Sequence, residues 1–224
     1  MSLKDAWRDA FPAESARAVV AYVMEMWKQT AAKQVPAFSW EQKEPVLTQK
    51  FKTVLRDDAR AAGLSGNWGA EDVSQKLDPK TLEKIKAFKT DITYYSDREY
   101  PKILALTFEW KKLLDQPKSR SGYWGPAGMG RFLEEGGYSK DAPFGLMVGI
   151  LPSPAAKTHV DALRKAMNDD GAVSFLNYVP ADNGQHVRRP STEMPGLSDF
   201  DTQHVRNSGG FQTFTFCHLF VYFP

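Results

Sequence analysis

The stretch that decides the fold is Lys102-Ile103-Leu104-Ala105-Leu106-Thr107-Phe108-Glu109-Trp110-Lys111-Lys112. Side chains on a β-strand alternate between its two faces. One face of this segment consists of large apolar residues, namely Leu104, Leu106, Phe108 and Trp110. The other face ends in Glu109 and Lys111, which point the same way where the apolar pattern gives way to charge. We therefore predict a long strand with one buried face and a charged end.

A second strand is predicted directly before this one. Residues 91–96 are rich in β-formers, and residues 97–101 have the composition of a turn. In the antiparallel hairpin that results, Asp91 begins one strand, lies near the end of the long strand 102–112, and can converge with Glu109 and Lys111. Two converging carboxylates can hold a hard cation such as Mg²⁺, and a lysine can stabilise negative charge or position a water. This set suits metal-assisted hydrolysis of a phosphodiester.

The rest of the chain alternates between helical and extended patterns. Helices are predicted near residues 13–34, 44–62, 79–88, 127–136 and 155–168. Further strands are predicted at 144–151, 172–179 and 211–223. Residues 63–80 are typical of a loop, and 180–210 of a long polar connection. This order predicts an α/β fold in which helices flank a mixed β-sheet. The last strand, apolar on both faces, is either buried or an edge that a partner covers.

The composition excludes several classes of site. The chain has 224 residues, of which 42% are hydrophobic and 12% aromatic, as in a folded domain with a sizeable core. The single cysteine, Cys217, rules out a disulfide framework and a cysteine-based zinc site. The four histidines lack metal-ligand spacing. No phosphate-binding glycine motif or serine-hydrolase elbow is present.

Charge and hydropathy bear on partners and location. The formal charge is +2, from 29 Lys and Arg against 27 Asp and Glu, which neither indicates nor excludes binding of nucleic acid. The most apolar stretch, residues 211–224, has 14 residues, fewer than the roughly 20 of a membrane-spanning helix. The first residues carry no secretory signal pattern. We expect a cytoplasmic protein that does not bind membranes.

The spacing of the charged residues resembles that of a known family. Asp91, followed after 17 residues by Glu109-Trp110-Lys111, is similar to the motif of the PD-(D/E)XK nuclease superfamily, although Thr90 stands where that family usually has a proline. The resemblance implies a restriction-endonuclease-like fold in which Asp91 and Glu109 bind Mg²⁺, or Mn²⁺ as an alternative. It implies that Lys111 assists the attacking water. Glu44 matches a glutamate that the family often supplies from a preceding helix, as a further metal ligand.

The resemblance covers about residues 40–180 and implies a domain organisation and a function. Residues 1–38 would form an N-terminal helical segment, and residues 39–224 the nuclease domain with a C-terminal β-strand extension. The function implied is a metal-dependent endonuclease acting on DNA, as the nuclease component of a bacterial defence or restriction system. Because two strands must be cut, a homodimer or partner subunits are expected. The alternatives are a non-catalytic nucleic-acid- or protein-binding module on the same fold and an RNA-directed nuclease.

Basic residues after the long strand suggest a nucleic-acid contact. Residues 111–140 hold six Lys and Arg against three Asp and Glu, with six glycines interleaved. Close backbone approach to a phosphate chain would use such glycines, and Tyr123 and Trp124 could stack on a flipped base. The alternative is a surface loop with ordinary solvated charges. The residues predicted to contact the nucleic acid are Arg98, Lys112, Lys118, Arg120 and Arg131.

Each candidate residue also has a purely structural interpretation. Glu109 and Lys111 could form an ion pair at a solvated strand end, and Asp91 could simply cap or start a strand, since Asp is common at turns. Glu44 could be explained by the helix macrodipole, which favours an acid in the first turn, and Glu41 competes for its role. Of the remaining groups, His218 is expected to be a satisfied core or edge histidine, and Cys217 buried and inert.

Overall fold

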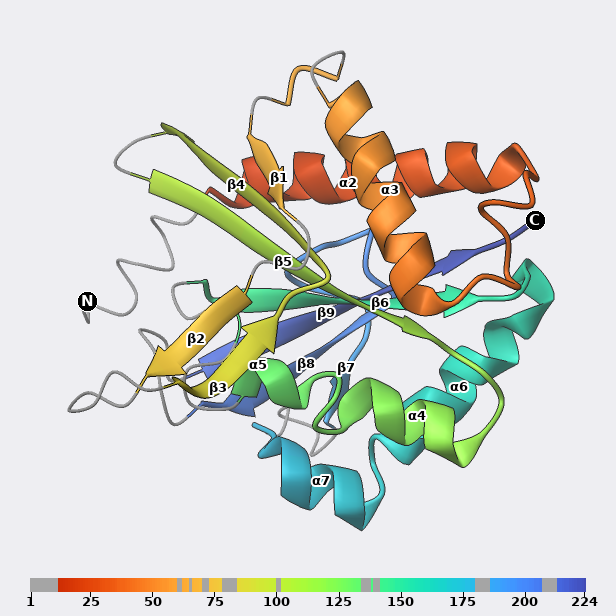
Figure 1. Cartoon of the computed structure of the whole chain (residues 1–224). Coiled ribbons are helices and arrows are strands. Elements are labelled where there is room, and N and C mark those ends of the chain that lie inside the picture. Colours follow the sequence, from red (N-terminus) through yellow and green to blue (C-terminus); the bar gives the residue numbers. More distant parts are fainter. Residues whose placement is uncertain are drawn as a thin grey trace.

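A mixed β-sheet forms the centre of the computed structural model, which describes residues 12–59, 62–64, 66–69, 73–77, 84–99, 102–133, 138, 142–179, 186–206 and 213–224 (Figure 1). Seven strands lie in the order β1-β4-β5-β6-β9-β8-β7. Their bounds are β1 Asn67–Gly69, β4 Ile92–Glu99, β5 Lys102–Lys112, β6 Phe144–Leu151, β7 Val187–Arg188, β8 Phe200–Val205 and β9 Thr213–Tyr222. The β5–β6 and β6–β9 pairs are parallel and the other pairs antiparallel. The predicted α/β fold with a mixed sheet is confirmed.

Helices cover both faces of this sheet (Figure 1). On one face lie α2 (Ala13–Ala32) and α3 (Glu44–Asp58), at the first two predicted positions. The other face carries α4 (Pro117–Trp124), α5 (Gly130–Leu133), α6 (Lys157–Ala166), preceded by the 3₁₀ turn η1 (Pro154–Ala156), and α7 (Asp170–Leu176). Among the described residues, no helix is long and apolar enough to cross a membrane.

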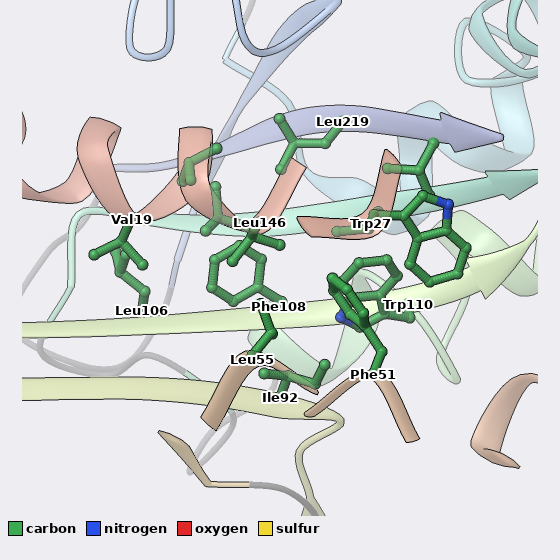
Figure 2. Close-up of a cluster of buried hydrophobic side chains, with 14 of the residues drawn as sticks. Val19, Trp27, Phe51, Leu55, Ile92, Leu106, Phe108, Trp110, Leu146 and Leu219 are labelled. Carbon is green, nitrogen blue, oxygen red and sulfur yellow. The ribbon is translucent and has the colours of Figure 1, made fainter. Parts of the chain in front are cut away.

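The apolar face of β5 packs against α2 and α3. In this cluster the Trp27 ring stacks on that of Trp110 with centroids 5.1 Å apart, and the edge of Phe51 meets both (Figure 2). Trp27, Phe51 and Trp110 are at most 1% exposed. Because α2 and α3 share this cluster with β5, both helices are anchored to the strand that carries Glu109 and Lys111.

The hairpin of β4 and β5 has the predicted antiparallel pairing. Ile92 lies opposite Phe108, so Asp91 directly precedes the paired part of β4. The predicted turn at residues 97–101 is wrong at its start, because β4 continues to Glu99. The hairpin thus brings the start of β4 next to the end of β5.

The final strand is buried, which excludes the interpretation as an edge. β9 lies between β6 and β8, and β6 is buried along its whole length. Parallel strands covered on both faces are typically near-continuous apolar runs. His218, on β9, is fully buried, and its two ring nitrogens form hydrogen bonds with the hydroxyls of Tyr123 and Thr202, as expected of a satisfied core histidine.

Three segments differ from the sequence prediction. The predicted loop at 63–80 contains β1 and β2 (Val73–Leu77), and the predicted helix at 79–88 falls partly on β3 (Lys84–Lys89), which pairs with β2. The predicted strand at 172–179 is mostly α7. The segment contains strand-forming residues, but Ala172 and Leu176 are buried one helical turn apart, which is the spacing of a helix that packs through one face. Short segments such as these are decided by what they pack against.

Three further elements lie where the pattern predicted none. The polar connection at 180–210 contains β7 and β8, and Asp201 on β8 organises it. The buried Asp201 carboxylate accepts hydrogen bonds from the Ser191 hydroxyl at 2.7 Å and from the backbone N–H of Thr192 at 2.7 Å. Helix α4 was missed because Tyr123 is its one buried residue, so no apolar periodicity marks it.

Candidate functional site

Four charged side chains predicted from the sequence meet at the end of β5. The Lys111 ammonium lies 2.6 Å from Oε1 of Glu109, 3.1 Å from Oε1 of Glu44 and 3.9 Å from Oδ2 of Asp91. Three carboxylates therefore surround one ammonium group, and they come from three different elements of the fold.

The hairpin positions Asp91. Its Oδ2 accepts a hydrogen bond of 2.9 Å from the backbone N–H of Trp110. This bond fixes the carboxylate beside β5, between the positions of Glu109 and Lys111. The same hydrogen bond agrees with the structural alternative, in which Asp91 caps or starts the strand β4.

Glu44 is positioned by the first turn of α3. The preceding Lys43 is extended and Pro45 follows, a sequence compatible with a helix start. Oε2 of Glu44 accepts the backbone N–H of Lys112 at 2.8 Å, while Oε1 contacts Lys111. Glu44 therefore links α3 to the end of β5. The helix macrodipole alone does not explain these two contacts. Glu41 is exposed in the turn before the helix, so the structure favours Glu44 for this place.

Glu109 is fully buried. The ion pair between Glu109 and Lys111 is present, at 2.6 Å, but its expected place at a solvated strand end is wrong, because Glu109 is buried. Burial, together with the charge of Asp91, raises the pKa of Glu109 to about 8, against the opposing charges of Lys111 and Arg131. Its Oε2 atom is buried without a hydrogen-bond partner among the described residues. A buried acceptor without a donor is costly, which makes this atom the part of the site most suited to a ligand.

Lys111 stays protonated in this setting. Burial lowers the pKa of Lys111, but the charges of Glu109, Glu44 and Asp91 together outweigh burial and raise it above the ordinary value. A lysine of this kind acts as a fixed positive charge and hydrogen-bond donor.

Arg131 belongs to the site in a way that the sequence did not indicate. Its Nη1 donates to Oε1 of Glu109 at 3.1 Å and to the Tyr138 hydroxyl at 3.1 Å. The Arg131 side chain, predicted to contact phosphates, is thus held against the buried carboxylate. Tyr138 was not a candidate at all. No sequence signal could have found this pairing, because Arg131 and Tyr138 follow the end of β5 by 19 and 26 positions and no periodicity relates them to Glu109.

The other predicted nucleic-acid contacts are distributed differently. The Lys112 ammonium contacts the backbone carbonyl of Trp40 and lies 4.1 Å from the centre of its ring. Arg120 forms an ion pair of 3.0 Å with Asp115, and Lys118 is exposed on α4. The side chain of Arg98 lies outside the described residues. The structure does not bring Lys112, Lys118 and Arg120 together with Arg131.

The aromatic and glycine predictions for this segment are corrected. Tyr123 is fully buried and its hydroxyl lies 3.1 Å from Nδ1 of His218, so it cannot stack on a base. Trp124 packs at a tilt against Phe175. A Cβ at Gly128 would lie 1.9 Å from the Tyr123 carbonyl oxygen. Crowding in the turn from α4 to α5 explains this glycine without a phosphate.

The chemistry of the carboxylates fits a hard divalent cation. When ionised, Asp91, Glu109 and Glu44 exceed the cations Lys111 and Arg131 by one negative charge, and oxygen ligands are those that Mg²⁺ prefers. As they stand, no three His, Cys, Asp or Glu side chains in the described part of the chain form a group that could hold a metal ion. The ammonium of Lys111 lies between the carboxylates instead.

The arrangement therefore holds a lysine ammonium among three carboxylates, whose oxygens are of the kind that hard cations prefer. Comparison of the chain with protein-family models, with curated proteins and with solved structures found no match.

Proposed function

We propose that this chain is a metal-dependent endonuclease with a restriction-endonuclease-like fold that hydrolyses phosphodiester bonds of DNA. The observation that carries the proposal is the convergence of Asp91, Glu109 and Glu44 on Lys111 at the open end of the β4–β5 hairpin. The surrounding mixed sheet, with α3 packed against β5, supports the same assignment.

Each residue has a role in this proposal. Asp91 and Glu109, with Glu44 as a further ligand, would hold Mg²⁺ or Mn²⁺. When bound, the cation supplies Lewis-acid stabilisation and lowers the pKa of water. Lys111 orients the attacking water and donates to the phosphoryl oxygen as charge develops there. Arg131 is a positioning residue, because it acts through its contact with Glu109.

The test is cleavage of supercoiled plasmid, linear duplex DNA and RNA in Mg²⁺ or Mn²⁺, with EDTA as the negative control. Asp91→Asn and Lys111→Met should each lower the rate by a factor of 100 or more, the usual order for a group acting on the transition state. Glu44→Gln should lower the rate too, whereas Glu41→Gln, three positions earlier and exposed, is the matched control. Cleavage that survives Asp91→Asn and Lys111→Met would refute the site assignment, and cleavage of RNA alone would identify an RNA-directed nuclease.

A second candidate is a non-catalytic binding module. The observation that favours it is the position of the Lys111 ammonium between the carboxylates. Its positive charge offsets their negative charge without a bound metal ion. Binding of DNA without cleavage under any metal or partner condition would support this candidate.

Assembly and biological context follow from the proposed reaction. Cutting both strands of a duplex requires two sites, so we propose a homodimer or partner subunits, and a role in a bacterial defence or restriction system. Sedimentation of the protein with and without a duplex measures its oligomeric state. A protein that stays monomeric and still produces double-strand breaks at a first-order rate would contradict the proposed assembly.

A further inference from the structure

The ammonium group of Lys111 lies inside a cage of oxygen atoms. Its Nζ atom is 2.6 Å from Oε1 of Glu109, 3.1 Å from Oε1 of Glu44 and 3.9 Å from Oδ2 of Asp91. It also donates a hydrogen bond of 2.9 Å to the backbone carbonyl oxygen of Trp110. The three closest of these oxygens match the three N–H donors of an ammonium group. The ammonium therefore fills the cage in the way that a bound cation would.

The cage is closed on its inner side and open on its outer side. Glu109, at the bottom, is 0% exposed, whereas the side chains of Asp91 and Glu44 at the rim are 22% and 23% exposed. The Oε2 atom of Glu109 is buried without a hydrogen-bond partner among the described residues. The ammonium thus leaves one oxygen at the bottom unused, and a cation that enters or leaves the cage passes the rim.

The charge of the cage suits one further cation but not two. When ionised, the three carboxylates carry a charge of −3, and Arg131, whose Nη1 lies 3.1 Å from Oε1 of Glu109, contributes +1. The remaining −2 is reduced to −1 by the ammonium of Lys111, whereas a divalent cation would cancel it. Both cations together would leave +1 in a largely buried space, where like charges within about 4 Å of each other repel strongly.

We propose that Lys111 is an autoinhibitory residue, whose ammonium occupies the place of the divalent cation and moves outward past the rim when that cation binds. The identity of the cation rests on the proposed function. An ammonium displaced to the open side of the cage lies where a substrate can reach it, which agrees with the catalytic role proposed for Lys111.

Isothermal titration calorimetry with MgCl₂ alone, in the absence of nucleic acid, compares the wild type with Lys111→Met. A measurement at pH 9 limits competition from the proton of Glu109, whose pKa is about 8. If the ammonium fills the cage in about nine molecules of ten, it raises the Kd for Mg²⁺ about tenfold. Methionine has no charge, so Lys111→Met should bind Mg²⁺ at least about tenfold more tightly than the wild type, although it should cleave more slowly.

Lys112→Met is the matched control, because it removes the same charge one position along the strand. The ammonium of Lys112 contacts the backbone carbonyl of Trp40 instead of the cage. A charge outside the cage acts through solvent, so this variant should change the Kd by less than about threefold. Binding by Lys111→Met that is no tighter than that of the wild type, or an equal gain in Lys112→Met, would overturn the proposal.

Lysine acetylation followed by mass spectrometry tests the displacement in the wild type, so this test does not depend on whether Lys111→Met folds. Lys111 is 14% exposed and held by carboxylates, whereas Lys28 is 79% exposed and is the internal reference. Mg²⁺ should accelerate the acetylation of Lys111 several-fold and leave that of Lys28 unchanged. NaCl at the same ionic strength is the control, because salt screens ion pairs. Acetylation of Lys111 that Mg²⁺ does not accelerate beyond the NaCl control would overturn the proposal.

The failure of this inference can be told apart from the failure of the proposed function. Release of Lys111 by Mg²⁺ in a protein that cleaves neither DNA nor RNA would leave the inference standing and refute the nuclease. Cleavage by a protein in which Mg²⁺ does not expose Lys111 would refute this inference alone.

Discussion

Replacing Lys111 by methionine tests whether the carboxylates are ionised around a buried ammonium. The substitution keeps the length of the side chain and removes its charge. Lys111 is 14% exposed and Glu109 is fully buried, and breaking a buried ion pair by removing one partner costs about 3–5 kcal/mol. Because Arg131 stays 3.1 Å from Glu109, we expect the lower end, about 3 kcal/mol near pH 8. For a chain of this size that is a fall in Tm of about 6–12 °C.

The cost should depend on pH with a definite sign. The pKa of Glu109 is raised from 4.5 to about 8, so its contribution to stability is present below pH 4.5 and is lost as the pH rises through about 8. Without the charge of Lys111, which lowers this pKa, the loss extends to higher pH. The difference in stability between the variant and the wild type should therefore grow from pH 6 to pH 9.

Thermal and urea unfolding at pH 6, 7.5 and 9, with and without 10 mM MgCl₂, measure these effects. Mg²⁺ should raise the Tm of the variant more than that of the wild type, because the variant retains more uncompensated negative charge. Lys28→Met is the control, since Lys28 is 79% exposed and pairs loosely with Glu25. A Lys111→Met variant no less stable than Lys28→Met, or a loss that does not grow with pH, would refute the reasoning.

The remaining predictions concern the frame around the site. Trp27→Ala should lower the free energy of unfolding by about 3–5 kcal/mol, measured by urea titration, because the ring is 1% exposed and stacked on Trp110; a loss below about 1 kcal/mol would contradict the packing. Asp201→Ala should cost about 1–3 kcal/mol, because it leaves the buried Ser191 hydroxyl and the backbone N–H of Thr192 without their acceptor, and the same titration on Asp201→Asn tests whether the charge matters. Burial lowers the pKa of His204 from 6.5 to about 3. Its contribution to stability is therefore present above pH 6.5 and is lost as the pH falls to about 3, by up to about 5 kcal/mol. His204→Gln should reduce the fall of Tm between pH 6.5 and pH 3, which a series of thermal melts measures.

The sequence predicted the part of the fold where one periodicity governs a long segment. β5 has its predicted bounds because its alternation of Leu104, Leu106, Phe108 and Trp110 has one face to bury. β6 likewise has its predicted bounds, since an eight-residue apolar run bounded by turn residues is typical of a strand covered on both faces. The hairpin followed from the adjacency of two such segments, and with it the approach of Asp91 to the end of β5.

The secondary structure of short segments was predicted wrongly where it depends on the neighbouring element that the segment pairs with or packs against. β3 was expected to be helical, because its lysines gave it the composition of a polar helix, yet pairing with β2 makes it a strand. α7 has strand formers but packs a helical face through Ala172 and Leu176. In both cases the competing local preferences differ by less than the energy of packing against a neighbour.

The candidate site divides in the same way. The order of residues by itself determined that Asp91, Glu109 and Lys111 lie at one end of a hairpin, because strand alternation and antiparallel pairing are local rules. Only the tertiary structure decided that Glu109 is buried, that Glu44 rather than Glu41 reaches the site, and that Arg131 and Tyr138 complete it. Those facts depend on contacts that residues of α3 and α5 make with β5 from distant parts of the chain. A local sequence pattern cannot predict such contacts.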